Sequence, residues 1–307
     1  MTLKVSLVTT VKDSGDHVGE FLASVRTQTR PPDEVVVVDG GSTDGTLEQL
    51  RAAEGITLIE EPGANISRGR NLAIQAATHD VLAVSDADCV LEPSWLERLL
   101  EPIESGADVS MGAYVPVVDG FLQACIAAVN LPSPEELDEA TFMPSARSVA
   151  FRRSAIEAAG GYPEWLDIGE DMYVNHRWRE LGLDLRLARG AVVHWRLRRG
   201  LRATWRQYHR YARGDAIAGM YPQRHALRFA VYGGLAASLL LRRRLPAIVA
   251  LLAGAAYAGR PTVRAVSRAR GPGTRAAAAV AVPAIMAFLD LAKMSGYVAG
   301  LLRRPRE

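Results

Sequence analysis

The sequence has few cysteines and no obvious leader. Only Cys89 and Cys125 occur among its 307 residues, and their spacing does not form a disulfide framework. A reducing, cytosolic setting is therefore expected. The first ten residues, MTLKVSLVTT, contain no basic stretch followed by an apolar core, so they predict a strand rather than a secretory signal peptide.

The glycine-rich motifs of two large nucleotide-binding classes are also missing. No GxGxxG follows the first predicted strand, and no GxxxxGK[ST] occurs anywhere in the chain. These absences argue against a dinucleotide-dependent dehydrogenase and against a P-loop NTPase.

Acidic residues are scarce in the last third of the chain. Residues 196–307 hold 21 Lys/Arg and 3 Asp/Glu, out of 36 and 34 in the whole chain, which leaves 15 and 31 for residues 1–195. Such asymmetry predicts a basic surface that meets anions, either nucleic acid or membrane headgroups. A hydrophobic content of 49% excludes a mainly disordered chain.

The acidic part alternates predicted strands with predicted helices. Apolar runs predict strands at 3–9, 35–38, 56–60 and 81–85, and helical patterns cover 17–27, a stretch from 46, and 66–77. This alternation predicts a parallel α/β sheet. Its ligand-binding edge would gather Thr9, Asp39 and Asp86.

The most informative stretch is VLAVSDADCV, residues 81–90, where a buried strand ends in two carboxylates. Alternate residues of an extended segment point to the same side, so Asp86 and Asp88 can face one ligand. Paired oxygen donors of this kind suit Mg²⁺ or Mn²⁺ bridging a diphosphate. The alternative is a solvated acidic turn that binds nothing.

Two further groups lie near the same edge. Asp39, at the end of the second strand, could accept hydrogen bonds from a ribose or a base. Arg70, on the third predicted helix, could meet a phosphate. The alternatives are a helix-capping turn over residues 39–44 and a solvated helix face for Arg68 and Arg70.

The segments VSLVTT, VVVVDGGSTDGT, GANISRGRNLAIQAATHDVLAVSDADCV and GED together resemble the family 2 glycosyltransferases of the GT-A fold, over residues 3–195. The resemblance implies a nucleoside-diphosphate-sugar donor (UDP or dTDP), a divalent cation, Mn²⁺ or Mg²⁺, and inversion at the anomeric carbon. It places Thr9 and Asp39 at the nucleoside, Arg70 near the donor, and Asp86 and Asp88 at the sugar and metal. The first loop, VKDSGD, departs from the acidic run that is common in the family.

A second acidic pair, Glu170 and Asp171, follows Gly169 and precedes a predicted helix at 172–181. Direct displacement needs a base within about 2.6–3.2 Å of the acceptor hydroxyl, and the first turn of a helix stabilises negative charge. The resemblance to the family's ED motif makes Asp171 that base, with Glu170 beside it. The alternative is that both acids only begin a helix.

His194 ends the apolar strand 191–193. Some GT-A enzymes use a histidine after the acceptor region as an extra metal ligand, and imidazole can join carboxylates on Mn²⁺. A histidine that ends a strand without binding metal is an equally open alternative.

The basic part begins with WRQYHRYARG, residues 205–214, which resembles the QxxRW segment of membrane-bound synthases of the same superfamily. Gln207 and Arg210 match that segment and would border the donor diphosphate, whereas Tyr211 replaces the tryptophan. On a helix, the arginines share one face beside an aromatic stripe. This pattern favours an interfacial helix whose arginines meet phosphate. The alternative is a packed aromatic stripe with a solvated cationic face.

Three apolar segments follow. Residues 229–241 and 245–258 are each about 20 Å long as helices, too short for a hydrocarbon core of about 30 Å. Residues 276–302 are long enough, although Pro283, Asp290 and Lys293 interrupt them. Arginines flank every segment, at 242–244, 260–275 and 303–306. Basic residues at both ends of each segment argue against helices that simply cross the membrane. A monotopic or re-entrant anchor is predicted; the alternative is a soluble helical appendage or dimer interface.

The predicted protein is an α/β GT-A domain (Rossmann-like, mostly parallel sheet) at 1–200, an interfacial amphipathic segment at 201–225, and an α-helical membrane-associated region at 226–307. It would be an inverting, metal-dependent glycosyltransferase on the cytoplasmic side of the cell membrane, with a lipid-linked or cell-envelope glycan acceptor and no nucleic-acid partner. The alternatives are a sugar-nucleotide nucleotidyltransferase, which would carry a basic glycine-rich loop after the first strand, and a non-catalytic membrane- or polyanion-binding module on a GT-A fold.

Overall fold

The computed structural model describes residues 3–303 and divides the chain into two compact units. The sheet unit takes the chain up to Val117 and again Pro132–Arg196. The helical unit takes Val118–Leu131 and the chain from Leu197 onward. The predicted domain 1–200 therefore differs from the observed unit, because residues 118–131 leave the sheet and join the C-terminal helices.

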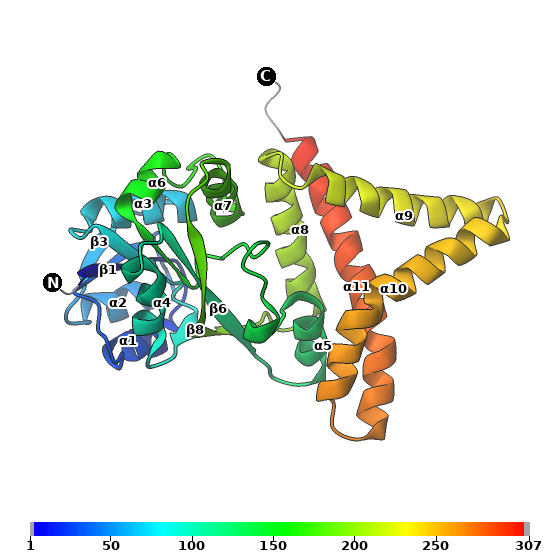
Figure 1. Ribbon diagram of the computed structural model, residues 1–307, viewed down its shortest axis with the longest axis horizontal. Coiled ribbons are helices and arrows are strands. Elements are labelled where there is room, and N and C mark those ends of the chain that lie inside the picture. The colour runs from blue at the N-terminus through cyan, green and yellow to red at the C-terminus, as the bar shows by residue number, and fades with distance from the viewer. Residues whose placement is uncertain (1–2, 304–307) are drawn as a thin grey trace. The chain divides into compact units, whose positions relative to one another are not determined.

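The sheet unit is built on one mixed eight-stranded sheet, in the order β3-β2-β1-β4-β7-β6-β8-β5 (Figure 1). The strands are β1 (Val5–Val11), β2 (Glu34–Asp39), β3 (Thr57–Glu60), β4 (Val81–Val84), β5 (Cys89–Leu91), β6 (Val109–Val117), β7 (Val149–Arg152) and β8 (Leu185–Arg196).

The first four strands run parallel, as the alternating pattern predicts, and this brings their carboxyl ends to one edge. Val11 of β1 lies opposite Asp39 of β2, and Val8 of β1 lies opposite Val84 of β4. Strands β5 and β7 enter antiparallel to their neighbours. The acids that follow β2 and β4 therefore gather at the edge where open α/β sheets bind ligands.

Helices cover both faces of this sheet (Figure 1). The helices of the sheet unit are α1 (Val18–Arg26), α2 (Thr46–Arg51), α3 (Ile66–Ala76), α4 (Trp95–Glu104), α6 (Arg153–Ala158) and α7 (Glu170–Glu180). Apolar side chains of α3, α6 and α7 form one core with alternate residues of the strands, including Val8, Val36 and Val84. The predicted α/β architecture is confirmed.

A close helix–strand approach positions α3 over β1. The Asn65 side chain caps the start of α3 by accepting the backbone N–H of Arg68 at 2.9 Å. One turn on, a Cβ atom at Gly69 would overlap the Thr10 hydroxyl, so only glycine allows the helix to lie this near the strand. The next residue, Arg70, is thereby held against the sheet edge.

The helical unit consists of α5 (Phe121–Asn130), α8 (Leu201–Ile217), α9 (Pro222–Leu240), α10 (Arg244–Arg268) and α11 (Pro272–Leu301). Apolar residues of α5 pack with α10 and α11 in a single core around Val282 and Leu289. Gly296 and Gly300 of α11 lie against the backbone of α8, where a side chain of any size would clash. Small residues at this spacing let two helices approach closely.

The charged residues that interrupt the predicted apolar segment of α11 face other helices of the unit. Buried Asp290 accepts a hydrogen bond from Arg228 of α9 at 2.9 Å and another from Tyr232 at 3.2 Å. Lys293 lies over the ring of Tyr208 in α8. These contacts explain why a long apolar helix carries ionisable groups, since buried charges need partners.

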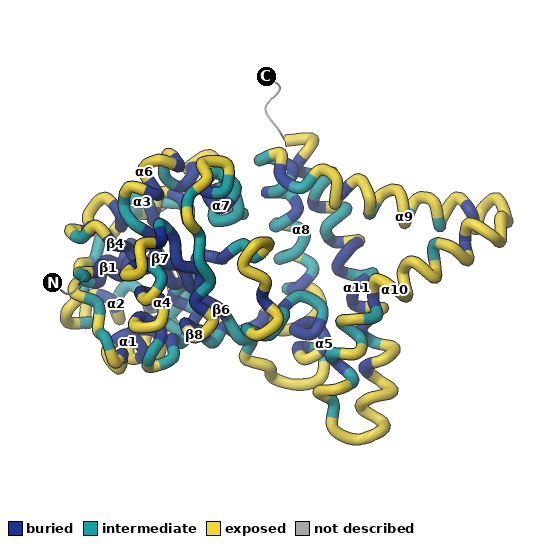
Figure 2. The backbone as a smooth tube through the Cα atoms, viewed as in Figure 1, coloured by how far each residue is buried: buried dark blue, intermediate teal, exposed yellow. Residues whose placement is uncertain are grey.

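One helix in the described part of the chain, α11, has the length and composition to cross a membrane. Its mean hydropathy is 1.7 in the most apolar window, of which 39% is buried within the protein. Most of α9 and the first half of α10 are exposed instead (Figure 2), including the apolar residues Leu239, Leu240 and Leu245. The predicted basic flank at 303–306 lies, apart from Arg303, outside the described residues.

Candidate active site

Asp39 ends β2 beneath the loop that follows it. Its buried carboxylate accepts the backbone N–H groups of Gly41 and Ser42, both at 2.9 Å, and the Ser42 hydroxyl at 2.6 Å. These bonds fold the loop back over the strand end, which is the turn-forming role considered as an alternative. A nucleoside contact of Asp39 stays a prediction and would use the remaining lone pairs.

Two buried hydroxyls lie side by side at the same edge. Thr9 is on β1 and Ser85 directly follows β4, and neither hydroxyl has a hydrogen-bond partner among residues 3–303. Leaving a buried polar group unsatisfied costs about 1–3 kcal/mol. Both hydroxyls are buried, so a contact of Thr9 with a nucleoside stays a prediction. Ser85 was not anticipated from the sequence.

Arg70 links the two acidic pairs. Its guanidinium is 2% exposed and donates to Asp86 at 2.8 Å and to Glu170, which begins α7. Residues from α3, the end of β4 and the start of α7 are thereby joined. Both sides of the fork are bonded to carboxylates, so Arg70 holds Asp86 and Glu170 in place. A contact of Arg70 with a donor phosphate stays a prediction.

Burial and charge act against each other in this cluster. Burial raises the pKa of Glu170, and the nearby Arg70 opposes that rise. Burial alone would lower the pKa of Arg70, but Glu170 and Asp86 together raise it. The guanidinium therefore stays charged and holds Asp86 in a fixed orientation.

Asp171 occupies a more open position than Glu170. Gly169, with φ of 83°, makes the left-handed turn that starts α7, and Asp171 is half-buried in the first turn. Its carboxylate accepts the backbone N–H of Ala146 at 3.4 Å and that of Met172 at 2.8 Å. Of the two acids predicted to be catalytic, Asp171 is the one that an acceptor could reach, because Glu170 is buried against Arg70.

Asp88 is the second acid after β4 and is half-buried. Its carboxylate accepts a long hydrogen bond of 3.7 Å from the buried Cys89 thiol. Mg²⁺ and Mn²⁺ are commonly held by one or two carboxylates, with substrate phosphates and water completing the shell. The carboxylates of Asp88 and Asp86 are suited to be such a pair of metal ligands. Asp88 is the better candidate of the two, because Asp86 is already bonded to Arg70.

His194 does not join the two aspartates. Its Nε2 lies 3.1 Å from Oε1 of Glu92, across the antiparallel pairing of β5 and β8. Within residues 3–303, no three His, Cys, Asp or Glu side chains cluster closely enough to hold a metal ion. His194 therefore pairs with Glu92 and does not take the place predicted for a third metal ligand. In the pairing of β5 with β8 it lies opposite Val90, not Asp88.

Arg147 is a site residue that the sequence analysis missed. It lies just before β7, with Nε 3.8 Å from Oδ2 of Asp86. Its guanidinium lies 4.0 Å from the ring centre of Trp195 and 5.7 Å from that of Tyr114. No motif marks Arg147, and its position depends on the antiparallel return of β7 beside β4.

Gln207 and Arg210 both lie on α8 of the helical unit. The Gln207 side-chain amide donates to the Tyr211 hydroxyl at 2.8 Å, and Arg210 is exposed. A contact of either residue with a donor stays a prediction.

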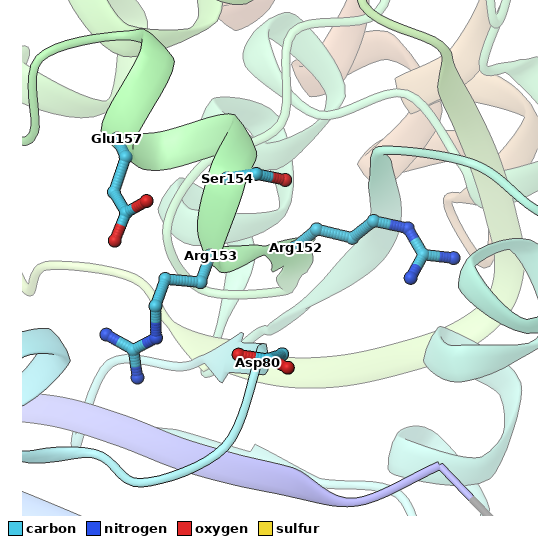
Figure 3. Close-up of a pocket in the computed structure, with 5 residues that line it drawn as sticks. All are labelled: Asp80, Arg152, Arg153, Ser154 and Glu157. Carbon is cyan, nitrogen blue, oxygen red and sulfur yellow. The ribbon is translucent and has the colours of Figure 1, made fainter.

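A separate pocket lies at the opposite end of β4, lined by Asp80, Arg152, Arg153, Ser154 and Glu157 (Figure 3). Its two arginines serve the fold. Arg153 donates to the carbonyls of Ile74 and Ala77 at the end of α3, and Arg152 donates to that of Ile103 in α4. They neutralise helix carboxyl termini there.

Comparison with solved structures identifies the fold. The mannosyltransferase PcManGT from Pyrobaculum calidifontis, solved in complex with GDP-Man and Mn²⁺, matches with a TM-score of 0.58 at 20% identity, over 99% of this chain and 89% of that one. The GT-A fold predicted from the sequence is thereby confirmed. The model of glycosyl transferase family 21 matches residues 70–305, so the chain belongs to that family, and the model of glycosyl transferase family 2 matches residues 6–124.

Relatives of known name are similar over part of their length. Glycosyltransferase AglE of Haloferax volcanii is 29% identical over 206 residues, which cover 61% of this chain and 65% of AglE. The O-antigen chain rhamnosyltransferase RfbN of Salmonella typhimurium is 26% identical over 206 residues, which cover 62% of this chain and 66% of RfbN. The chain thus spans just under two thirds of each relative.

Proposed function

We propose that this glycosyltransferase moves a sugar, with inversion, from a nucleoside-diphosphate sugar to a lipid-linked or cell-envelope glycan at the cytoplasmic face of a membrane. The observation that carries the proposal is that Arg70 joins Asp86 to Glu170 at one edge of the sheet. This ion-pair network brings the acidic pair Asp86 and Asp88 close to the acidic pair Glu170 and Asp171. The complex of PcManGT with GDP-Man and Mn²⁺ supports this class of donor, and the O-antigen activity of RfbN supports an envelope acceptor.

In this proposal the two acidic pairs have different tasks. Asp88, with Asp86, would hold a divalent cation, which when bound neutralises the charge of the leaving diphosphate. Asp86, held by Arg70, would accept a hydrogen bond from the donor sugar. Asp171 would take the proton of the attacking acceptor hydroxyl, and one direct displacement inverts the anomeric carbon.

The first test is thermal stabilisation of the detergent-extracted protein by GDP, UDP, dTDP and their sugars, with Mn²⁺, Mg²⁺ or EDTA. A ligand that binds the native state raises stability by RT ln(1 + [L]/Kd). We expect one nucleotide to give a metal-dependent shift. No shift with any nucleotide, in folded protein, would contradict the donor assignment.

Asp88→Asn is expected to remove the metal-dependent part of that shift. Losing a ligand should weaken metal-supported nucleotide binding by at least the 10–100-fold that is typical for an outer-shell partner. The matched control is Asp80→Asn, an exposed aspartate at the opposite end of β4, which should bind as the unmodified protein does. Unchanged metal dependence in Asp88→Asn would contradict its assignment as a ligand.

The helical unit supports the proposed membrane location. Around the turn between α9 and α10, Leu240, Leu241 and Leu245 are 83%, 70% and 72% exposed, and further exposed apolar residues continue along α10. The turn carries Arg242 and Arg243, and Arg244 begins α10. An apolar surface with an arginine cluster suits helices that lie in the headgroup region, where arginine meets lipid phosphate.

Leu240→Asp is expected to weaken binding to vesicles of phosphatidylcholine with phosphatidylglycerol by about tenfold to a hundredfold, since burying one leucine contributes about 1.5–3 kcal/mol. Flotation through a density gradient measures the bound fraction. Leu181→Asp, at an exposed leucine of the sheet unit, is the control and should float normally. Equal flotation of both variants would argue for the soluble-appendage alternative.

A further inference from the structure

Arg147 occupies a place between the two acidic pairs. Its side chain approaches Asp86 at 3.8 Å, while the preceding residue, Ala146, donates its backbone N–H to Asp171. The short segment before β7 therefore borders both the acid proposed to face the donor sugar and the proposed base.

The acidic cluster requires a cation beside any phosphate that binds at this edge. Asp86, Asp88, Glu170 and Asp171 bring four carboxylates, and Arg70 is fully occupied by two of them. A phosphate entering such a site meets repulsion unless a cation lies beside it. Arg147 is the guanidinium at this edge whose side chain keeps solvent contact, at 16% exposed compared with 2% for Arg70.

The surroundings of Arg147 orient its guanidinium. The guanidinium lies over Trp195, with Tyr114 on the same side, and its Nη1 donates to the Ser145 hydroxyl at 3.1 Å. The approach of Nε to Asp86 is longer than a hydrogen bond. A planar guanidinium positioned by stacking is suited to two-point binding of phosphate.

We propose that Arg147 binds a phosphate group of a substrate at the transfer site. This inference rests on the proposed function and adds a residue that is not part of the acidic motifs. The phosphate could belong to the donor diphosphate or to a phosphate-bearing lipid acceptor, and both present the same tetrahedral anion.

The test compares ligands that differ only in phosphate. On the donor arm, the nucleoside diphosphate that stabilises the detergent-extracted full chain best is compared with its free nucleoside. On the acceptor arm, geranyl phosphate is compared with geraniol. Each affinity is measured by thermal shift, with Mn²⁺ and with EDTA, for the unmodified protein and for Arg147→Gln, Arg147→Lys and Arg98→Gln.

We expect Arg147→Gln to lower the affinity for the phosphate-bearing ligand of one arm by about tenfold to a hundredfold, the range for a charge-assisted hydrogen bond, and to leave its phosphate-free counterpart unchanged. Arg147→Lys should recover part of the loss, since it keeps the charge without the fork. Arg98→Gln, at an exposed arginine of α4, should change nothing. The arm that responds names the source of the phosphate.

Two results would overturn the inference. If Arg147→Gln weakens phosphate-bearing and phosphate-free ligands equally, Arg147 only supports the local structure. If Arg147→Gln prefers each phosphate-bearing ligand over its phosphate-free counterpart as strongly as the unmodified protein does, Arg147 does not contact phosphate. In either case the unmodified protein still binds nucleotide, whereas failure of the proposed function itself would show as no nucleotide binding by the unmodified protein.

Discussion

Asp171→Asn is expected to lower the rate of sugar transfer by about 10²- to 10⁴-fold, the range attributed to a positioned general base. Asparagine keeps the size of the side chain and can still accept the hydrogen bond from Ala146, but it cannot take a proton from the acceptor. Nucleotide binding should persist, because Asp88 and Asp86 remain. The measurement is release of nucleoside diphosphate with a lipid extract as acceptor, paired with nucleotide thermal shifts.

The matched control for this variant lies on the same helix. Glu180→Gln, at the opposite end of α7, removes an acid whose only described ion pair is an exposed one with Arg177, so transfer should be unchanged. If Asp171→Asn loses as much nucleotide affinity as Asp88→Asn, the two acids do not have the separate roles of base and metal ligand.

Arg70→Gln is expected to lower the free energy of unfolding by about 3–5 kcal/mol, because it leaves two carboxylates without their buried cation. The effect should depend on pH. Without Arg70 the pKa of Glu170 rises further, so the native state binds a proton that the unfolded state releases, and the loss of stability shrinks as the pH falls. Chemical denaturation at several pH values measures both effects.

Arg68→Gln provides the comparison, since it removes an arginine two residues away on the same helix. Arg68 pairs with Glu61 and Glu164 at the surface, where an ion pair contributes about 0–1 kcal/mol. Similar stability of the Arg70 and Arg68 variants would mean that the buried cluster does not hold β4, α3 and α7 together.

The order of elements in the sheet unit could be predicted from the sequence because it depends on local patterns. The predicted run at 35–38 is apolar at every position and lies within β2, and the helix predicted at 66–77 is observed at Ile66–Ala76. By contrast, the antiparallel entry of β7 and the pairing of β5 with β8 arise from contacts between distant residues. No local pattern encodes such pairings, so the places of Arg147 and His194 could not be foreseen.

The candidate site was predictable where chemistry follows directly from a strand end. Asp86 and Asp88 follow β4, whereas Asp171 lies in the first turn of α7. What the sequence could not show is which charges neutralise one another, since Arg70 and Glu170 are 100 residues apart in the chain. Helical periodicity alone allowed Arg70 to face solvent, and tertiary contacts decided otherwise.

The departure of residues 118–131 from the sheet unit has a consequence for synthesis of the chain. Helix α5 leaves the ribosome well before α10 and α11, whose side chains bury its Cys125, Ile126 and Ala128. Until more than a hundred further residues have been made, this short apolar helix has no partner, and an apolar surface left open invites misassembly. In a nascent chain the apolar face of α5 therefore stays uncovered until α10 and α11 have been made.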